Sequence, residues 1–289
     1  MRVIPASELI INADGSVFHL HLKPGQLAEK IVLVGDPERV SAVASCFDSI
    51  ECEVSNREFH SVTGMFGEKR ISVVSHGIGT DNIDIVLNEL DALVNIDFSS
   101  RTVKDKFTQL TLVRIGTSGG LQHFVPVGTY VAAERSVGFD GVIYFYANSQ
   151  TVRDLPFEEE LYHQLQWKIS GIRPYVVTAD KSLIEQITKD DIIRGVTIAA
   201  NGFYGPQGRE LRLQLADPEL NKKIEAFNFK GSQITNFEME SSSLAGLSSL
   251  MGHRAMTVCC IIAGRVDKNM NTDYKDSLPV LIDKVLNRI

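Results

Sequence analysis

The sequence has no excess of basic residues and no long apolar run, and these two absences exclude several classes of protein. Its 289 residues include 29 lysines and arginines against 36 aspartates and glutamates, which gives a net charge of −7. Phosphate backbones and anionic membranes attract proteins with a basic excess, so we expect neither nucleic acid nor a membrane as a partner. No apolar stretch approaches the roughly 20 residues that a membrane helix requires. Any anion that the protein binds must therefore be held by a local cluster of arginines.

Cysteine is also scarce, and its pattern indicates neither a disulfide framework nor a metal site. The four cysteines are Cys46, Cys52, Cys259 and Cys260, and none belongs to a C-x-x-C pair. The two histidines of Phe18-His19-Leu20-His21 would share a strand face, but they lack a third ligand, so we expect no metal. The N-terminus lacks the basic-then-apolar pattern of a secretion signal. These features predict free thiols in a cytoplasmic protein.

What recurs along the chain is a short β-branched run followed by a helical pattern. Apolar stripes of helical period follow Gly79 and occupy the C-terminus, while residues 95–108 are polar enough for a surface insertion. Strands are predicted at residues 31–34, 69–75, 109–115, 127–137, 196–200 and 255–263. The last of these is apolar throughout, as in the centre of a sheet covered on both faces. Strands alternating with helices predict an α/β sandwich with a largely parallel sheet, in a single domain of residues 1–289.

A first polar segment follows the strand predicted at residues 31–34, and ligands bind beyond strand ends in folds of this kind. The segment is Gly35-Asp36-Pro37-Glu38-Arg39, and it begins a helix whose free N–H groups attract anions. Arg39 would add a positive charge. Alternatively the segment is a turn in which Asp36 caps the helix and Arg39 is solvated.

A second segment, residues 114–120, places Arg114 before a run of small residues. We expect the strand to end at Ile115 and the following glycines to form a loop with the composition of an anion-binding nest. An arginine at a strand end within an apolar sequence is costly unless it is paired or used. Neither this segment nor the first contains a P-loop or the G-x-G-x-x-G fingerprint, which argues against those nucleotide-binding modules.

A third segment, residues 202–209, combines glycine, proline and aromatic residues with Gln207 and Arg209. The glutamine amide supplies a donor and an acceptor, and the arginine supplies a planar fork of donors. Together they suit a planar ring with carbonyl oxygens and an N–H, such as uracil, and Phe203 could stack on that ring. The alternative is an exposed glycine-proline loop.

A fourth segment, residues 236–241, contains two carboxylates, Glu238 and Glu240. In a strand they would point to the same face and could reach the hydroxyls of a sugar, and a carboxylate pair is also typical of glycosidases. Alternatively, one of them caps the helix predicted at residues 241–251 and the other is solvated.

Taken together and in this order, these segments resemble the nucleoside phosphorylase family, most closely its uridine phosphorylase branch. The resemblance covers nearly the whole chain and implies a three-layer α/β/α sandwich with a central mixed, largely parallel sheet. The matching pieces are Phe18-His19, Gly35-Asp36-Pro37, Arg57-Glu58, Ser75-His76-Gly77-Ile78-Gly79, residues 114–120, residues 203–209, Glu238-Met239-Glu240-Ser241 and Arg265.

The resemblance implies a role for each matching position. Phosphate would be bound by Gly35, Arg39, Arg114 and Thr117, with Arg57 reaching in from a neighbouring subunit. The base would be bound by Phe203, Gln207 and Arg209, with Arg265 close to them. The ribose would be bound by Met239 and Glu240, with the neighbour's His19 at the 5′-hydroxyl. Such shared sites imply a homo-oligomer, either a dimer or a hexamer built of dimers.

The implied reaction is phosphorolysis of a pyrimidine nucleoside, above all of uridine and phosphate to uracil and ribose 1-phosphate. Arg209, Gln207, Arg114 and Glu240 would act on the reacting groups, with phosphate as co-substrate and with no metal or organic cofactor. Purine-specific branches carry an aspartate shortly after the last central strand, whereas residues 262–265 contain none, which disfavours purines. A hydrolytic nucleosidase, a purine nucleoside phosphorylase and a catalytically silent nucleoside-binding protein are the alternatives. Gly264 and Asn82 depart from the residues frequent in relatives, and the sugar preference stays open.

Overall fold

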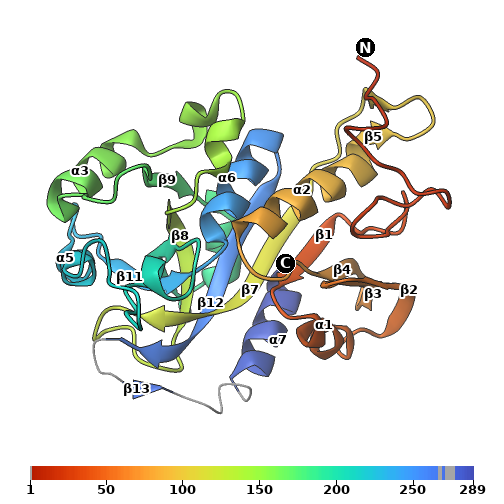
Figure 1. Ribbon diagram of the computed structural model, residues 1–289. Coiled ribbons are helices and arrows are strands. Elements are labelled where there is room, and N and C mark those ends of the chain that lie inside the picture. Colours follow the sequence, from red (N-terminus) through yellow and green to blue (C-terminus); the bar gives the residue numbers. More distant parts are fainter. Residues whose placement is uncertain (1, 266–268, 271–276) are drawn as a thin grey trace.

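The computed structural model describes residues 2–265, 269–270 and 277–289, and a large mixed β-sheet forms its centre (Figure 1). The strands of this sheet are β1 (Lys30–Val34), β2 (Ser49–Asn56), β3 (Phe59–Phe66), β4 (Lys69–Ser75), β7 (Thr111–Gly120), β8 (Tyr130–Gly138), β9 (Tyr175–Thr178), β10 (Ile193–Ala199), β11 (Ile234–Glu238), β12 (Arg254–Gly264) and β13 (Asn269–Met270). Their order is β13-β12-β8-β10-β11-β7-β1-β4-β3-β2, with β9 paired to β8. Strand β12 also pairs with β7, so both strands belong to the centre of the sheet. The central strands β4, β1, β7 and β12 run parallel to one another. Towards the edges, β2, β3 and β13 are antiparallel to their neighbours.

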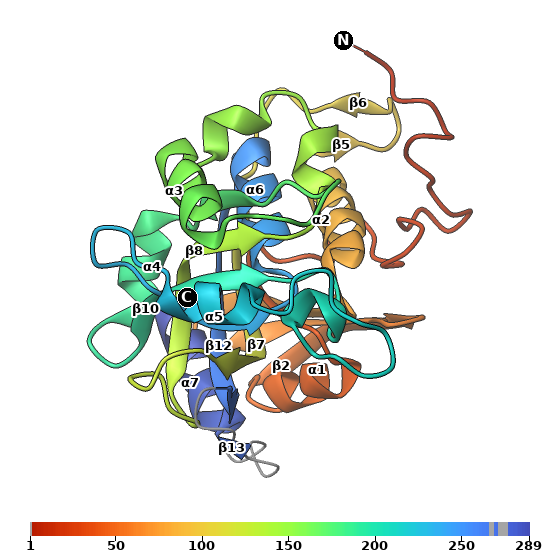
Figure 2. The same ribbon diagram turned by 60° about the vertical axis from the view of Figure 1, so that its left-hand side comes forward.

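Helices cover both faces of the sheet, which confirms the predicted α/β/α sandwich (Figures 1 and 2). They are α1 (Pro37–Ala44), α2 (Thr80–Asn95), α3 (Leu155–Leu165), α4 (Lys181–Thr188), α5 (Leu220–Ala226), α6 (Ser241–Met251) and α7 (Leu278–Arg288), with short 3₁₀ helices η1 (Val142–Phe145), η2 (Ser149–Val152) and η3 (Gly205–Gln207). Helices α2 and α6 lie side by side on one face, and α1, α4 and α7 pack on the other. Among the described residues, no helix has the length and apolarity needed to cross a membrane.

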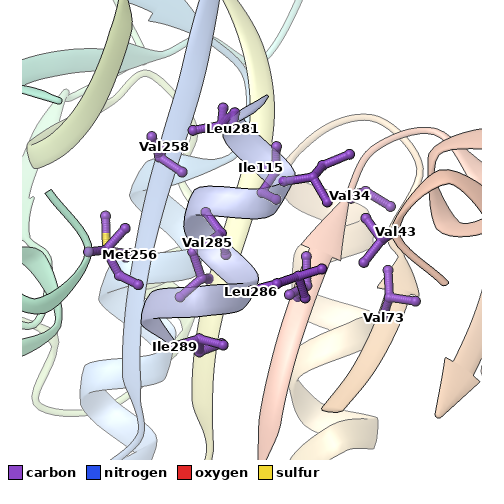
Figure 3. Close-up of a cluster of buried hydrophobic side chains, with 14 of the residues drawn as sticks. Val34, Val43, Val73, Ile115, Met256, Val258, Leu281, Val285, Leu286 and Ile289 are labelled. Carbon is purple, nitrogen blue, oxygen red and sulfur yellow. The ribbon is translucent and has the colours of Figure 1, made fainter. Parts of the chain in front are cut away.

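The two cores explain why the central strands are apolar at every position. In β1, Ile31 and Leu33 pack in the core beneath α2 and α6, whereas Val32 and Val34 pack in the core beneath α1, α4 and α7. Successive side chains of a strand point to opposite faces, so a strand covered on both sides must be apolar throughout. Figure 3 shows the second of these cores, in which the stripe of α7 meets the sheet. The helical stripe predicted at the C-terminus is therefore the inner face of α7.

Most elements lie close to where the sequence predicts them, with two clear exceptions. The strand predicted at residues 69–75 is β4, and the predicted insertion at residues 95–108 contains the small hairpin of β5 (Ile96–Asp97) and β6 (Thr102–Val103). The expected end of a strand at Ile115 is wrong, because β7 continues to Gly120 and its glycines pair with β12. The strand expected around His19 is absent too, since Phe18 to Leu20 form a turn.

The long strand β7 divides the sheet and thereby creates a space. Along one edge of β7, its first half pairs in parallel with β1, ending at Ile115 opposite Val34. Further along the same edge, Gly119 pairs with Phe237 of the antiparallel strand β11. The carboxyl ends of β1 and β11 therefore approach each other from opposite directions. Between them, this edge of β7 at residues 116–118 pairs with no strand among the described residues, and loops that follow both strands open into the gap.

Candidate active site

A cavity of about 1110 Å³ lies at this division of the sheet. Its wall is formed by the segments that follow β1 and β4, by the exposed edge of β7, by the loop after β10 and by the end of β11. Most of the residues expected to bind phosphate, base or ribose line it: Gly35, Arg39, Arg114, Thr117, Phe203, Gln207, Arg209, Met239 and Glu240. Segments far apart in the sequence thus meet in one space.

At the end of β1, a capped helix start and an arginine contribute to the cavity wall. Asp36 accepts a hydrogen bond from the Glu38 N–H at 2.9 Å and caps α1, as the alternative interpretation of this segment expected. Arg39 is nevertheless not directed only to solvent, because it lines the cavity and its Nη1 donates to the Ile115 carbonyl at 3.3 Å. A Cβ at Gly35 would lie 3.3 Å from the Gly77 carbonyl oxygen, so glycine lets the loops after β1 and β4 meet.

Arg114 of β7 is buried in the cavity wall and is held by two carboxylates and a histidine. Its Nη1 donates to Glu238 at 2.9 Å, its Nη2 donates to Glu240, and its Nε donates to His76 Nε2 at 3.1 Å. Burial alone would lower the pKa of this guanidinium, but the two carboxylates raise the pKa above its usual range, so Arg114 keeps its charge. A Cβ at Gly116 would lie only 2.7 Å from Arg114 Nη1, which explains why a glycine follows the arginine within the strand.

The two glutamates reach Arg114 across a turn rather than from one strand face, so the expected shared strand face is wrong. Strand β11 ends at Glu238, and Glu240 occupies the N-cap position of α6. Glu238 accepts hydrogen bonds from the N–H groups of Glu240 and Ser241 at 2.9 and 3.0 Å, so it satisfies the free donors at the start of the helix. Glu240 is not solvated as the alternative supposed, because it is 4% exposed and accepts from the Gly79 N–H at 2.7 Å.

The loop after β10 positions a glutamine and an arginine as a bonded pair. Arg209 Nη1 donates to Gln207 Oε1 and to the Phe203 carbonyl, both at 2.6 Å, and Gln207 is buried. Because an arginine can only donate, the amide oxygen of Gln207 faces it and the amide nitrogen remains a donor. The Nε and Nη2 groups of Arg209 donate to no other described residue. Asn221 Nδ2 also holds the loop, because it donates to the Gln207 carbonyl at 3.2 Å.

Arg265 supports this pair from outside the cavity. Its Nη2 donates to the Gln207 carbonyl, and its Cζ lies 5.1 Å from the centre of the Phe237 ring. Burial, together with the nearby charge of Arg209, lowers the pKa of Arg265 to about 10. We expected Arg265 close to Gln207 and Arg209. It contacts Gln207, although it does not line the cavity.

His19 and Arg57 lie close to each other and do not line the cavity of their own chain. The His19 carbonyl accepts from Asn56 at 2.8 Å, and Arg57 lies over the Phe18 ring at 5.8 Å. The Glu89 carboxylate binds both the backbone N–H and the Nδ1 atom of His19, at 2.9 and 2.6 Å. The structure therefore brings these two residues together in one surface cluster.

The sequence predicts no role for several residues that lie in or next to the cavity. Glu58 and Asn82 line the cavity and approach each other, with Asn82 Nδ2 at 3.4 Å from Glu58 Oε1. Glu238 was noticed as half of a carboxylate pair, but its bonds to Arg114 and to the helix start carry no sequence signature. His76 contacts Arg114 without lining the cavity, and a lone histidine after a strand gives no spacing by which to recognise it.

The arrangement combines three kinds of group in one space. Two arginines, Arg39 and Arg114, can hold an anion, and Gln207 with Arg209 can bind a planar polar ring. The carboxylate of Glu240 can accept hydrogen bonds from hydroxyls. A molecule with a polar ring joined to a hydroxylated group, placed next to an anion, would satisfy all three.

Comparison with known proteins identifies the family. Residues 29–285 match the model of the phosphorylase superfamily. The chain is 28% identical to a uridine phosphorylase of Thermococcus kodakarensis over 261 residues, which cover 88% of this chain and 79% of that protein. It is 25% identical to a DeoD-type purine nucleoside phosphorylase of Listeria monocytogenes over 244 residues, 84% of this chain and 85% of the relative.

The fold agrees with that match. A nucleoside phosphorylase of Trypanosoma brucei, whose crystal structure is described as showing uridine phosphorylase activity, superposes with a TM-score of 0.84. The two chains share 26% identity, and the superposition covers 97% of this chain and 98% of the other. The chain belongs to the phosphorylase superfamily and is an enzyme of the nucleoside phosphorylase family, a pentosyltransferase.

Proposed function

We propose that this protein cleaves the N-glycosidic bond of a pyrimidine nucleoside with phosphate, converting uridine and phosphate to uracil and ribose 1-phosphate. The observation that carries the proposal is that one cavity is lined by the Gln207–Arg209 pair, by Arg114 and by the buried carboxylate of Glu240. The names of the related proteins support the same reaction.

The hydrogen-bonding pattern of the Gln207–Arg209 pair favours uracil over cytosine. Gln207 offers its amide nitrogen as a donor and its oxygen as an acceptor, and Arg209 offers further donors beside that oxygen. This donor–acceptor–donor order is complementary to the two carbonyls and the central N–H of uracil or thymine. Cytosine presents an unprotonated nitrogen and an amino group there, so two of its contacts would be repulsive. Phe203 would stack on the ring.

The proposed mechanism places stabilising groups where charge develops. As the glycosidic bond stretches, the ribose gains positive character and the uracil gains negative charge, which Arg209 and Gln207 stabilise. Phosphate bound by Arg39, Arg114, Thr117 and the backbone at Gly35 would attack C1′. Preorganised donors of this kind each contribute roughly 10²–10³ in rate. No metal or organic cofactor is needed for these steps.

The ribose would lie between the base and the phosphate. Met239 would contact the sugar, and Glu240 would orient it by accepting from its hydroxyls rather than by donating a proton. The cluster of His19 and Arg57 would complete the site of a neighbouring subunit, with His19 at the 5′-hydroxyl and Arg57 at the phosphate. The working form would then be a dimer or a hexamer of dimers. We place it in the cytoplasm, which fits four cysteines that are all free.

The site argues against hydrolysis and against purine substrates, and turnover distinguishes an enzyme from a silent binding protein. A hydrolase needs no cluster of arginines to hold a nucleophile, yet Arg39 and Arg114 line the same cavity. For purines, the segment at residues 262–265 offers no aspartate to protonate N7. A silent binding protein would retain nucleoside affinity without turnover.

The test is base release from uridine with and without phosphate, run beside thymidine, cytidine, inosine and AMP. We expect uracil to appear only with phosphate, together with ribose 1-phosphate, and we expect no release from cytidine. Release without phosphate would mean a nucleosidase, and release from the purine nucleosides alone would overturn the base assignment. Nucleoside binding without any release would favour the silent binding protein.

A further inference from the structure

His76 is a fully buried side chain whose position is set by the strand that precedes it. It follows β4 directly, and its backbone N–H donates to the Val34 carbonyl at 2.9 Å, which ties it to the end of β1. The imidazole is 0% exposed and does not line the cavity. It contacts the side chain of Arg114 instead, with Nε2 at 3.1 Å from Arg114 Nε. His76 therefore lies outside the cavity lining and contacts Arg114, which is proposed to bind phosphate.

The contact fixes the protonation state of the ring. An arginine Nε carries a hydrogen and can only donate, so the Nε2 of His76 must be the unprotonated nitrogen and Nδ1 must carry the proton. Nδ1 lies beside the Gly77 backbone and has no well-formed hydrogen bond with any described residue. Burial, followed by the charges of Arg114 and Arg39, lowers the pKa of His76 well below its usual value. The imidazole is therefore a neutral acceptor throughout the physiological range.

The donors of Arg114 show what the histidine adds. A guanidinium has five N–H groups. Nη1 donates to Glu238 and, at 3.8 Å, to the Cys259 sulfur, and Nη2 donates to Glu240. Among the described residues, His76 is the partner of Nε. The carboxylates hold the two outer nitrogens, and the imidazole holds the inner one, so the plane of the guanidinium is fixed at three points.

We propose that His76 is a positioning residue that acts through Arg114, accepting its Nε–H so that the remaining guanidinium N–H is directed at the phosphate. This inference rests on the proposed phosphate-binding role of Arg114. Without an acceptor on Nε, the buried N–H would be left unsatisfied and the guanidinium would turn towards another partner. The phosphate would then lose an aligned donor although Arg114 kept its charge.

Three substitutions test the role. Gln places its amide oxygen near the position of Nε2, Asn places its oxygen near that of Nδ1, and Leu fills the space without an acceptor. We expect H76N and H76L to raise the KM for phosphate about tenfold or more, the loss expected for one hydrogen bond to a charged group. H76Q should stay close to the wild-type KM, and the KM for uridine should change least in all three. Wild-type phosphate KM values in H76N and H76L would overturn the proposal, as would equal impairment of all three variants.

A second measurement separates this inference from the proposed reaction. The rise in thermal midpoint that inorganic phosphate produces is measured for the wild type and the three variants, and it requires no turnover. We expect the rise in the wild type and in H76Q, and a much smaller rise in H76N and H76L. If the wild type released no base but showed this pattern, the reaction would be wrong and the positioning role would stand. If the wild type released uracil but phosphate raised the thermal midpoint equally in all four proteins, the reaction would stand and the positioning role of His76 would be wrong.

The same scans report whether each variant folds. Should H76L fail to fold, the comparison of H76Q with H76N carries the test, since both are polar and neither introduces a charge. Nitrogen-15 spectra of the histidine rings add a direct readout of the tautomer, with the His76 signal identified by its loss in H76Q. A proton on Nδ1 at pH 6 and pH 8 supports the assignment, and a proton on Nε2 would overturn it.

Discussion

The guanidinium of Arg209 lies over the ring of Phe203, with Cζ 3.8 Å from the ring centre. Phe203 is 51% exposed, and the ring of Tyr204 packs edge-to-face with it at 5.3 Å between centroids. The stack also explains why Arg209 can hold its bond to Gln207 at the edge of a loop. Phe203, which is expected to stack on the base, thus also supports the side chain of Arg209.

Replacing Phe203 by leucine should therefore weaken uridine binding, because it removes both the ring proposed to stack on the base and the ring that supports Arg209. We expect F203L to raise the KM for uridine about twofold to thirtyfold, because a cation–π contact contributes roughly 0.5–2 kcal/mol. F203Y keeps the ring and is the matched control, with a KM close to that of the wild type. Steady-state kinetics at saturating phosphate measure the effect, and an unchanged KM in F203L would show that the stack does not support binding.

Removal of Arg209 itself should affect the transition state more than the ground state. R209A loses a donor aimed at the leaving base, and we expect kcat/KM for uridine to fall by roughly 10²–10³ with the fold intact. Arg212 lies in the same loop, is exposed and provides the control, since R212A should keep the wild-type rate. Near-normal activity of R209A would remove Arg209 from the base-binding role.

Neutralising Arg114 should change phosphate binding and stability together. We expect R114Q to raise the KM for phosphate more than that for uridine. It should also lower the free energy of unfolding by about 3 kcal/mol or more, because Glu238 and Glu240 would be left buried without their cation. Urea unfolding checks the second effect, with K222Q as the control because its ion pair with Glu219 is exposed. If only the uridine KM moved, Arg114 would not be a phosphate ligand.

The sequence predicts the elements of this fold better than it predicts their ends. The β-branched run at residues 69–75 is β4 without any shift, because an apolar run bounded by turn residues has few other solutions. At Gly116 the same reasoning failed, since glycine usually ends a strand and here it admits the side chain of Arg114. What decides that case is the partner strand β12, which lies far away in the sequence.

The sequence also indicates which residues line the cavity, but not how those residues are held. Arginines and polar residues at strand ends were recognised because their types suit anions and planar rings, and most of them meet in one cavity. The way in which they are held could not be read from the sequence. Glu238 and Glu240 are two residues apart as in a strand, yet a turn brings both to Arg114. His76 meets Arg114 only because β4 and β7 flank β1.

The ion pairs of Asp191 should make stability depend on pH. Its carboxylate binds Arg288 through two bonds of 2.7 Å and also pairs with Lys284, which joins α7 to the segment after α4. The hydrogen bonds from Arg288 and then Lys284 lower the pKa of Asp191 well below its usual range. A lowered pKa in the folded state stabilises the fold at pH values above the pKa of the unfolded chain, about 3.9, and this stabilisation is lost as the pH falls further.

We therefore expect D191N to be less stable than the wild type at pH 7 and the difference to shrink below about pH 4. Because the carboxylate is 39% exposed, solvent screening limits the difference to about 1 kcal/mol, and 1 M salt should reduce it further. Urea unfolding at pH 7, 5 and 3 measures it. The neighbouring Asp190 is exposed, and D190N is the matched control, with wild-type stability at each pH. A difference between D191N and the wild type that stayed constant from pH 7 to pH 3 would mean that Asp191 acts through packing and not through its charge.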